Sequence, residues 1–146
     1  MTEEPLSSTF QLTGCEQLTL AGLIQAAANL SNAGQTSTAR QLYQIWIEHN
    51  PDHPQLYVAH FNCAALAGQM QDQAAAAVSL GEAIKQNPDF APAYINLGRI
   101  HENSGATAQA VELWRLAASR PAPISASAVN ARRNQRNPLL MPSSSQ

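Results

Sequence analysis

The sequence predicts an all-α fold of three antiparallel helical hairpins that stack into a right-handed solenoid. The 146-residue chain is dominated by 26 alanines and 14 glutamines, and both are better helix formers than strand formers. The tripeptide Asn-Pro-Asp at 50–52 recurs 37 residues later at 87–89, and Tyr57 recurs at the same interval as Tyr94. Between these landmarks, apolar residues recur every three to four positions, which indicates amphipathic helices.

The first hairpin is expected to consist of helices at 16–32 and 38–49. An apolar stripe at helical spacing marks each of them. The two stripes are Leu20, Leu23, Ile24, Ala27 and Leu30, then Ala39, Leu42, Tyr43, Trp46 and Ile47. Gly34 is expected to end the first helix as a left-handed cap, and Pro51 and Pro54 to separate the second helix from the next hairpin.

The second and third hairpins repeat the order of helix, glycine turn, helix and proline turn. Helices are expected at 55–66, 71–86, 92–103 and 107–119. Gly68 and Gly105, again 37 residues apart, are expected to end the third and fifth helices. Asn87-Pro88 and the prolines after position 120 end the fourth and sixth.

The hairpins are therefore expected at about 16–50, 54–87 and 91–119, within one domain at 15–120. One hairpin cannot bury its apolar face alone, and three stacked units are about the minimum for a stable array. Residues 1–14 are expected to be flexible, and the Pro-, Ser- and Arg-rich residues 121–146 to be disordered, because neither segment has an apolar stripe.

Charge and composition exclude several classes of protein. The net charge of −2 argues against a nucleic-acid partner, and Arg132, Arg133 and Arg136 in the tail have no aromatic residue between them. No apolar run approaches the length of a membrane span, and acids stand where a secretory signal needs bases. We therefore expect no membrane association and a cytoplasmic location.

No constellation for catalysis or metal binding is present. The sequence has no nucleophile elbow, no phosphate-binding loop and no HExxH motif. Cys15 and Cys63 form no CxxC pair, and prolines break the helix around His49 and His53. The chain is therefore expected to be no enzyme, with no catalytic residue, no metal site and no cofactor.

The landmarks resemble the tetratricopeptide repeat, whose pattern places Tyr, Gly, Ala and Pro at fixed intervals. The third hairpin matches best, with His101 in a slot where tyrosine is usual. Its matching residues are Tyr94, Leu97, Gly98, Gly105, Ala110, Trp114, Ala117 and, one position early, Pro121. In the first hairpin Trp46 stands where a small alanine is expected.

The second hairpin departs from the pattern at two points. It places Phe61 where the small glycine belongs, and it has three extra residues between Gly68 and Pro88. The small slot lies where two helices touch. A large side chain there would push the helices apart, so we expect a locally altered helix crossing.

Residues 34–118 also resemble the repeats that precede the catalytic part of bacterial SPINDLY-type O-linked N-acetylglucosamine transferases. The phrases that carry this resemblance are NPDFAPAYINLGRIHENSGATAQAVELW and LYQIWIEHNPDHPQLY. Such transferases pass N-acetylglucosamine from a UDP-sugar to Ser or Thr. The catalytic region they use has no counterpart after Pro121.

In that family an asparagine near the start of each inner helix contacts the backbone of a bound peptide. The resemblance places Asn96 in this role, with Gln25 and Ala59 in the equivalent slots of the other hairpins. A side-chain amide supplies a donor and an acceptor at once, which suits an extended backbone of any sequence. The candidates expected to share the groove are Asn62, Arg99 and Asn103.

The expected function is protein–protein interaction, with a peptide or partner protein bound in a concave groove. The alternatives are a fragment or truncated product of a SPINDLY-type glycosyltransferase, and a stand-alone adaptor in an assembly or secretion pathway. Prolines at 121, 123 and 138 leave no room for a capping helix after the last hairpin. We therefore expect its exposed apolar face to dock onto another copy or onto a further domain.

Overall fold

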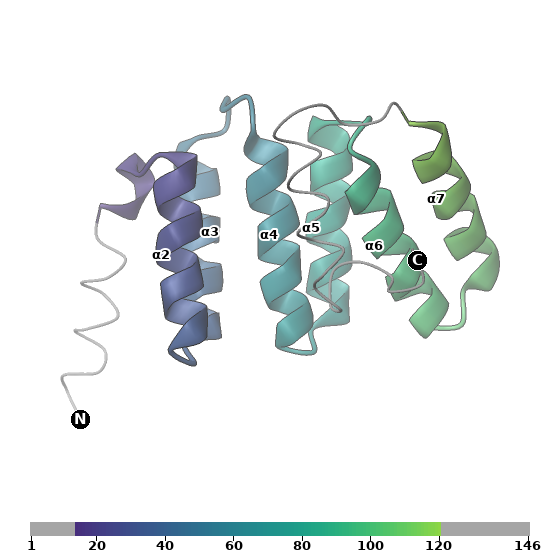
Figure 1. Ribbon diagram of the computed structural model, residues 1–146, viewed down its shortest axis with the longest axis horizontal. Coiled ribbons are helices and arrows are strands. Elements are labelled where there is room, and N and C mark those ends of the chain that lie inside the picture. The colour runs from purple at the N-terminus through teal and green to yellow at the C-terminus, as the bar shows by residue number, and fades with distance from the viewer. Residues whose placement is uncertain (1–13, 121–146) are drawn as a thin grey trace.

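The computed structural model describes residues 14–120, in which the chain forms helices and turns but no strand. The elements are η1 (Cys15–Gln17), α2 (Leu20–Asn32), α3 (Thr36–His49), α4 (Leu56–Gln69), α5 (Gln73–Gln86), α6 (Ala91–Asn103) and α7 (Thr107–Ser119). Figure 1 shows the α-helices following one another in chain order along the array, from α2 at one end to α7 at the other. The predicted all-α array of stacked helical hairpins is confirmed. The predictions for 1–13 and 121–146 concern residues outside the described part.

Each hairpin packs within itself and then against the next. The most extensive contacts join α2 to α3, α4 to α5 and α6 to α7, and smaller ones join α3 to α4 and α5 to α6. Two helix starts are fixed by side-chain caps: Thr19 Oγ1 accepts from Gly22 N at 3.0 Å, and Asp72 Oδ1 accepts from Ala75 N at 3.1 Å. In Figure 1, α2, α4 and α6 lie on one side of the array, with α3 and α5 behind. We call the side of α2, α4 and α6 the inner face.

The turn inside each hairpin is a left-handed residue, but the second is not the predicted glycine. Gly34 and Gly105 have φ of 84° and 89°, whereas α4 continues through Gly68 and the left-handed residue is Gln71, with φ 64°. Each turn is closed by the same backbone bond, for which Asp72 N donates to Ala67 O at 2.9 Å in the second hairpin. The prediction that Gly68 ends the helix is therefore wrong. The prediction of three extra residues between Gly68 and Pro88 is wrong as well, because it counted from Gly68 rather than from Gln71.

These turns fix how the three hairpins correspond. Gln71 follows Gly34 by 37 residues, and Gly105 follows Gln71 by 34. The helices therefore repeat at 37 residues between the first and second hairpins and at 34 between the second and third. The sequence landmarks at 50–57 and 87–94 are 37 residues apart, although the helices of these two hairpins repeat at 34 residues. The landmarks are therefore not at equivalent helix positions: Tyr57 is the second residue of α4, whereas Tyr94 is the fourth of α6.

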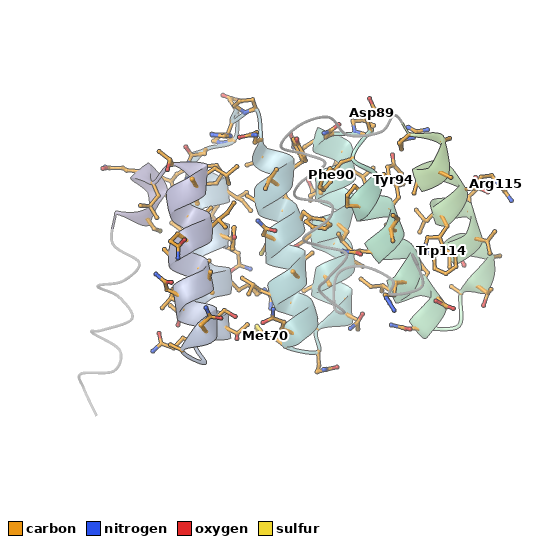
Figure 2. All side chains as sticks on the ribbon, viewed as in Figure 1. Met70, Asp89, Phe90, Tyr94, Trp114 and Arg115 are labelled. Carbon is orange, nitrogen blue, oxygen red and sulfur yellow. The ribbon has the colours of Figure 1, made fainter. Side chains whose placement is uncertain are left out.

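The small slot of each hairpin faces a larger residue on the partner helix. In register, the small slots are Ala27, Ala64 and Gly98, and the facing residues are Tyr43, Leu80 and Trp114. A Cβ at Gly98 would lie 2.8 Å from Trp114 Cδ1, so the tryptophan fits only against glycine. Figure 2 shows Trp114 between α6 and α7, where its Nε1 donates to Ile95 O at 3.2 Å.

The prediction that Phe61 fills the small slot of the second hairpin is wrong, because Ala64 does. Phe61 instead packs edge-on against Phe90, with ring centroids 5.1 Å apart, and Phe90 packs against Tyr57 at 5.0 Å. These aromatic residues join the second hairpin to the third. The bulky residue therefore connects two hairpins rather than distorting one.

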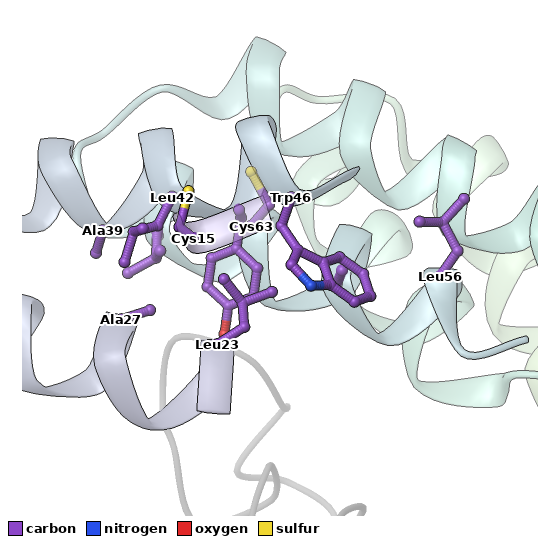
Figure 3. Packing of buried hydrophobic residues seen from close by; sticks show 11 residues of the cluster. Cys15, Leu23, Ala27, Ala39, Leu42, Trp46, Leu56 and Cys63 are labelled. Atoms are coloured by element: carbon purple, nitrogen blue, oxygen red, sulfur yellow. The ribbon is translucent and has the colours of Figure 1, made fainter. Parts of the chain in front are cut away.

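Trp46 fills a slot that is alanine in the other hairpins, and the N-terminal segment covers it. Its counterparts are Ala83 and Ala117. Trp46 is fully buried, and its Nε1 donates to Leu18 O at 2.7 Å. Figure 3 shows it among Leu23, Leu42, Cys15 and Cys63. The segment from Gly14 to Thr19 therefore closes the first end of the core.

The other end of the array is less covered. Only Ala110 and Ala117 of α7 are buried, and Val111 is 44% exposed. None of the helices between residues 14 and 120 is both long enough and apolar enough to cross a bilayer.

Candidate functional site

Two cavities open between successive hairpins along the inner face. The N-terminal pocket lies among α2, α3 and α4 and measures about 270 Å³; the C-terminal pocket lies among α4, α5 and α6 and measures about 260 Å³. Eight lining residues of the first are Ala27, Ala28, Ser31, Tyr43, Asn62, Ala65, Leu66 and Gln69. Their counterparts in the second, in the same order, are Ala64, Ala65, Gly68, Leu80, Asn96, Arg99, Ile100 and Asn103. The two pockets are therefore lined by residues at equivalent positions of successive hairpins.

The register changes which residue of the second hairpin corresponds to Asn96. Asn62, not Ala59, corresponds to Asn96, and Ala59 is fully buried in the core. The amide row is therefore Gln25, Asn62 and Asn96, one residue on each helix of the inner face. The prediction that Ala59 occupies the slot equivalent to Asn96 is wrong, because it used the 37-residue interval of the tripeptide where the helices repeat at 34 residues.

Four of the five predicted groove residues line a pocket. Asn62 lines the N-terminal one, and Asn96, Arg99 and Asn103 line the C-terminal one. Gln25 lines neither, since it is exposed on α2 and its Nε2 donates to Asn29 Oδ1 at 3.1 Å.

In the N-terminal pocket the amide has a polar neighbour. Burial raises the pKa of the Tyr43 hydroxyl, and interaction with the Asn62 side chain beside it lowers that pKa in part. The hydroxyl therefore stays neutral, and it is the polar neighbour of the Asn62 amide in this pocket. The sequence did not predict that Tyr43 and Asn62 meet, because Tyr43 was assigned to the apolar stripe that forms the core.

In the C-terminal pocket the corresponding amide has no such partner. Leu80 stands where Tyr43 stands in the first pocket, and Asn96 is 6% exposed. Asn96 Oδ1 and Arg99 Nη1 are buried and have no hydrogen-bond partner among residues 14–120. A buried polar atom without a partner destabilises a fold by about 1–3 kcal/mol. Because Asn96 and Arg99 both line the pocket, these two atoms are candidates for ligand contacts.

Two histidines and both cysteines have surroundings that the structure describes. His53 Nδ1 accepts from Gln55 N at 3.0 Å, and burial lowers the pKa of His60, with the charge of Glu82 opposing that shift. Burial raises the pKa of the Cys63 thiol, and Cys15 is also buried and forms no disulfide. No three potential metal ligands gather anywhere from residue 14 to residue 120.

Comparison with known proteins supports the repeat assignment. Residues 80–112 match the family model described as tetratricopeptide repeat. Among solved structures, the crystal structure of MamA is similar, with a TM-score of 0.58 and 19% sequence identity. The similarity covers 68% of this chain and 56% of the MamA chain. No curated protein matches the chain. Residues 80–112 are therefore similar to a tetratricopeptide repeat, and they lie within an all-α array of three stacked helical hairpins.

Proposed function

We propose that the chain is a protein–protein interaction module that binds an extended peptide segment of a partner along its inner face. The observation that carries this proposal is the pair of equivalent pockets, each with an asparagine from the inner helix at the same register. An extended peptide presents its backbone groups at regular intervals. A repeated amide matches such a ligand whatever its side chains, because it both donates and accepts.

Selection from a phage-displayed library of random linear peptides, with the full chain immobilised, tests this function. Peptides recovered from the library are then measured by fluorescence anisotropy against wild type, Asn96→Ala and the control Gln41→Ala, which removes an exposed amide from α3. We expect Asn96→Ala to weaken binding and Gln41→Ala to leave it unchanged. Failure to select any peptide, or equal binding by all three proteins, would overturn the proposal.

The resemblance of residues 34–118 to SPINDLY-type repeats supports a narrower proposal. The array would then recruit protein substrates for an O-linked N-acetylglucosamine transferase, with the catalytic region supplied elsewhere. The chain alone is expected to release no UDP from UDP-N-acetylglucosamine. Steady UDP release by the purified chain would contradict this division of labour.

The uncovered end of the array supports a proposal of self-association through α7. Val111 is 44% exposed there, and Leu113, Trp114 and Leu116 are only half-buried. Sedimentation velocity is expected to show a concentration-dependent dimer that Val111→Glu abolishes. A monomer at every concentration would overturn it.

A further inference from the structure

Arg99 differs from every other base of the described part in having no acidic partner. Arg40 pairs with Asp72, Lys85 with Glu82, Arg115 with Glu112 and Arg120 with Asp89. No carboxylate between residues 14 and 120 reaches Arg99, and its Nη1 is buried. A buried guanidinium nitrogen without an acceptor is unfavourable, so the free chain holds this cation ready for an anion that it does not itself supply.

The equivalent pocket shows that this cation is not needed for folding. The counterpart of Arg99 is Ala65, which lines the N-terminal pocket at the same register. There Asn62 already has Tyr43 as a partner. The N-terminal pocket is therefore lined by neutral residues, with the Asn62 amide beside a hydroxyl, while the C-terminal pocket has a cation and an acceptor oxygen whose buried atoms lack partners.

Resting on the proposed peptide groove, we propose that the C-terminal pocket is its specificity site and takes the side-chain carboxylate of an aspartate or glutamate in the bound peptide. The carboxylate accepts from the Arg99 guanidinium in the charge-assisted, forked geometry that this pair favours. A backbone N–H of the peptide donates to Asn96 Oδ1. Both buried atoms that lack partners in the free chain are then satisfied at once.

Charge favours a carboxylate over a phosphate. Arg99 is the only charged residue among those that line the pocket. Residues 14–120 have eight acids against five bases, a net charge of −3. One guanidinium in an acidic surrounding balances a single negative charge, whereas a phosphorylated side chain carries nearly two and is usually met by several cations.

Depth favours a side chain over a peptide terminus. Arg99 Nη1 and Asn96 Oδ1 are both inaccessible to solvent, and Asn96 is 6% exposed. A group must project from the peptide to reach the bottom of the pocket. The peptide itself then continues along the inner face toward Asn62 in the next pocket.

The test compares the peptides selected by wild type with those selected by Arg99→Ala and Arg99→Glu, all as full chains. Arg99→Ala introduces the residue that the N-terminal pocket has at the same register, Ala65. Thermal unfolding followed by circular dichroism checks that each variant folds. The control is Arg115→Ala, which removes the same charge from a residue that Figure 2 shows pointing away from the array on α7. Selected peptides are resynthesised with the acid as Glu, Gln or phosphoserine, and with the C-terminus as carboxylate or amide.

We expect one position enriched in Asp or Glu for wild type and Arg115→Ala, no such enrichment for Arg99→Ala, and Lys or Arg there for Arg99→Glu. Changing the peptide Glu to Gln should weaken wild-type binding about 10- to 100-fold and leave Arg99→Ala binding unchanged. Peptides that need Asn96 but show no acid preference would overturn this inference and leave the peptide groove intact. Tighter binding of phosphoserine, or dependence on the C-terminal carboxylate, would also overturn it. No selected peptide at all would overturn the groove and this site together.

Discussion

Leucine at Asn96 and leucine at Asn62 should change stability in opposite directions, although the two residues occupy the same register. Asn96 is 6% exposed and its Oδ1 has no partner among residues 14–120. An unsatisfied buried group destabilises by about 1–3 kcal/mol, and leucine of similar volume removes it while adding apolar contact beside Leu80. Asn96→Leu is therefore expected to raise the free energy of unfolding by about 1–2 kcal/mol.

Asn62→Leu should do the reverse. It removes the amide beside Tyr43, and the hydroxyl is then buried without that polar neighbour. The expected loss is about 1–2 kcal/mol. For an array of this size one kcal/mol corresponds to about 4 °C in Tm, so the two variants should differ by roughly 8–16 °C.

Urea and thermal unfolding followed by circular dichroism measure both free energies. Tyr43→Phe is the matched control, because without the hydroxyl Asn62→Leu should lose most of its effect. Equal destabilisation by Asn96→Leu and Asn62→Leu would refute the reasoning. It would mean that Asn96 Oδ1 is satisfied in the free protein, and the case for a ligand at that atom would fall with it.

Three further predictions concern the fold. Gly98→Ala should destabilise the fold by about 1–3 kcal/mol, because the new Cβ meets the ring of Trp114. Gly81→Ala, with open space around it, should stabilise the fold by roughly 0.5–1 kcal/mol. Urea titration of both variants checks the two values. Gln71→Gly should raise Tm by relieving a left-handed residue, a gain of about 1 kcal/mol, and no gain would contradict the turn assignment. Burial lowers the pKa of His60 in the fold, so the unfolded chain binds the proton first and stability should fall as pH drops below the ordinary histidine value of 6.5. Unfolding measured across pH should show a smaller fall for His60→Gln, and an unchanged profile would exclude His60 as the cause.

The helical hairpins could be read from the sequence because local signals agree with the fold. The observed limits of α7 are those predicted, and the left-handed turns at Gly34 and Gly105 lie where these glycines predicted them. The second turn was misplaced because Gln71 adopts a left-handed conformation that its residue type does not announce. Gly68 lies 37 residues before Gly105, which made it a plausible helix end, but α4 continues through it.

That single error of register hid the symmetry of the candidate site. The sequence predicted Asn96 and Arg99 as groove residues, and both line a pocket, yet the match of Asn62 to Asn96 required the positions of the helices. The pairing of Tyr43 with Asn62 and the leucine that lines the pocket with Asn96 could not be foreseen, because both depend on which side chains meet across three helices. Spacing along one helix carries no such information.

The two tryptophans stand at opposite ends of the array in different surroundings. Trp46 is sealed beneath the N-terminal segment and bonded to Leu18, while Trp114 on the last helix is half-buried. Their fluorescence should therefore differ, with emission at shorter wavelength from the sealed indole. Single-tryptophan versions would report separately on each end and reveal whether the array comes apart in one concerted step or frays first from its last helix.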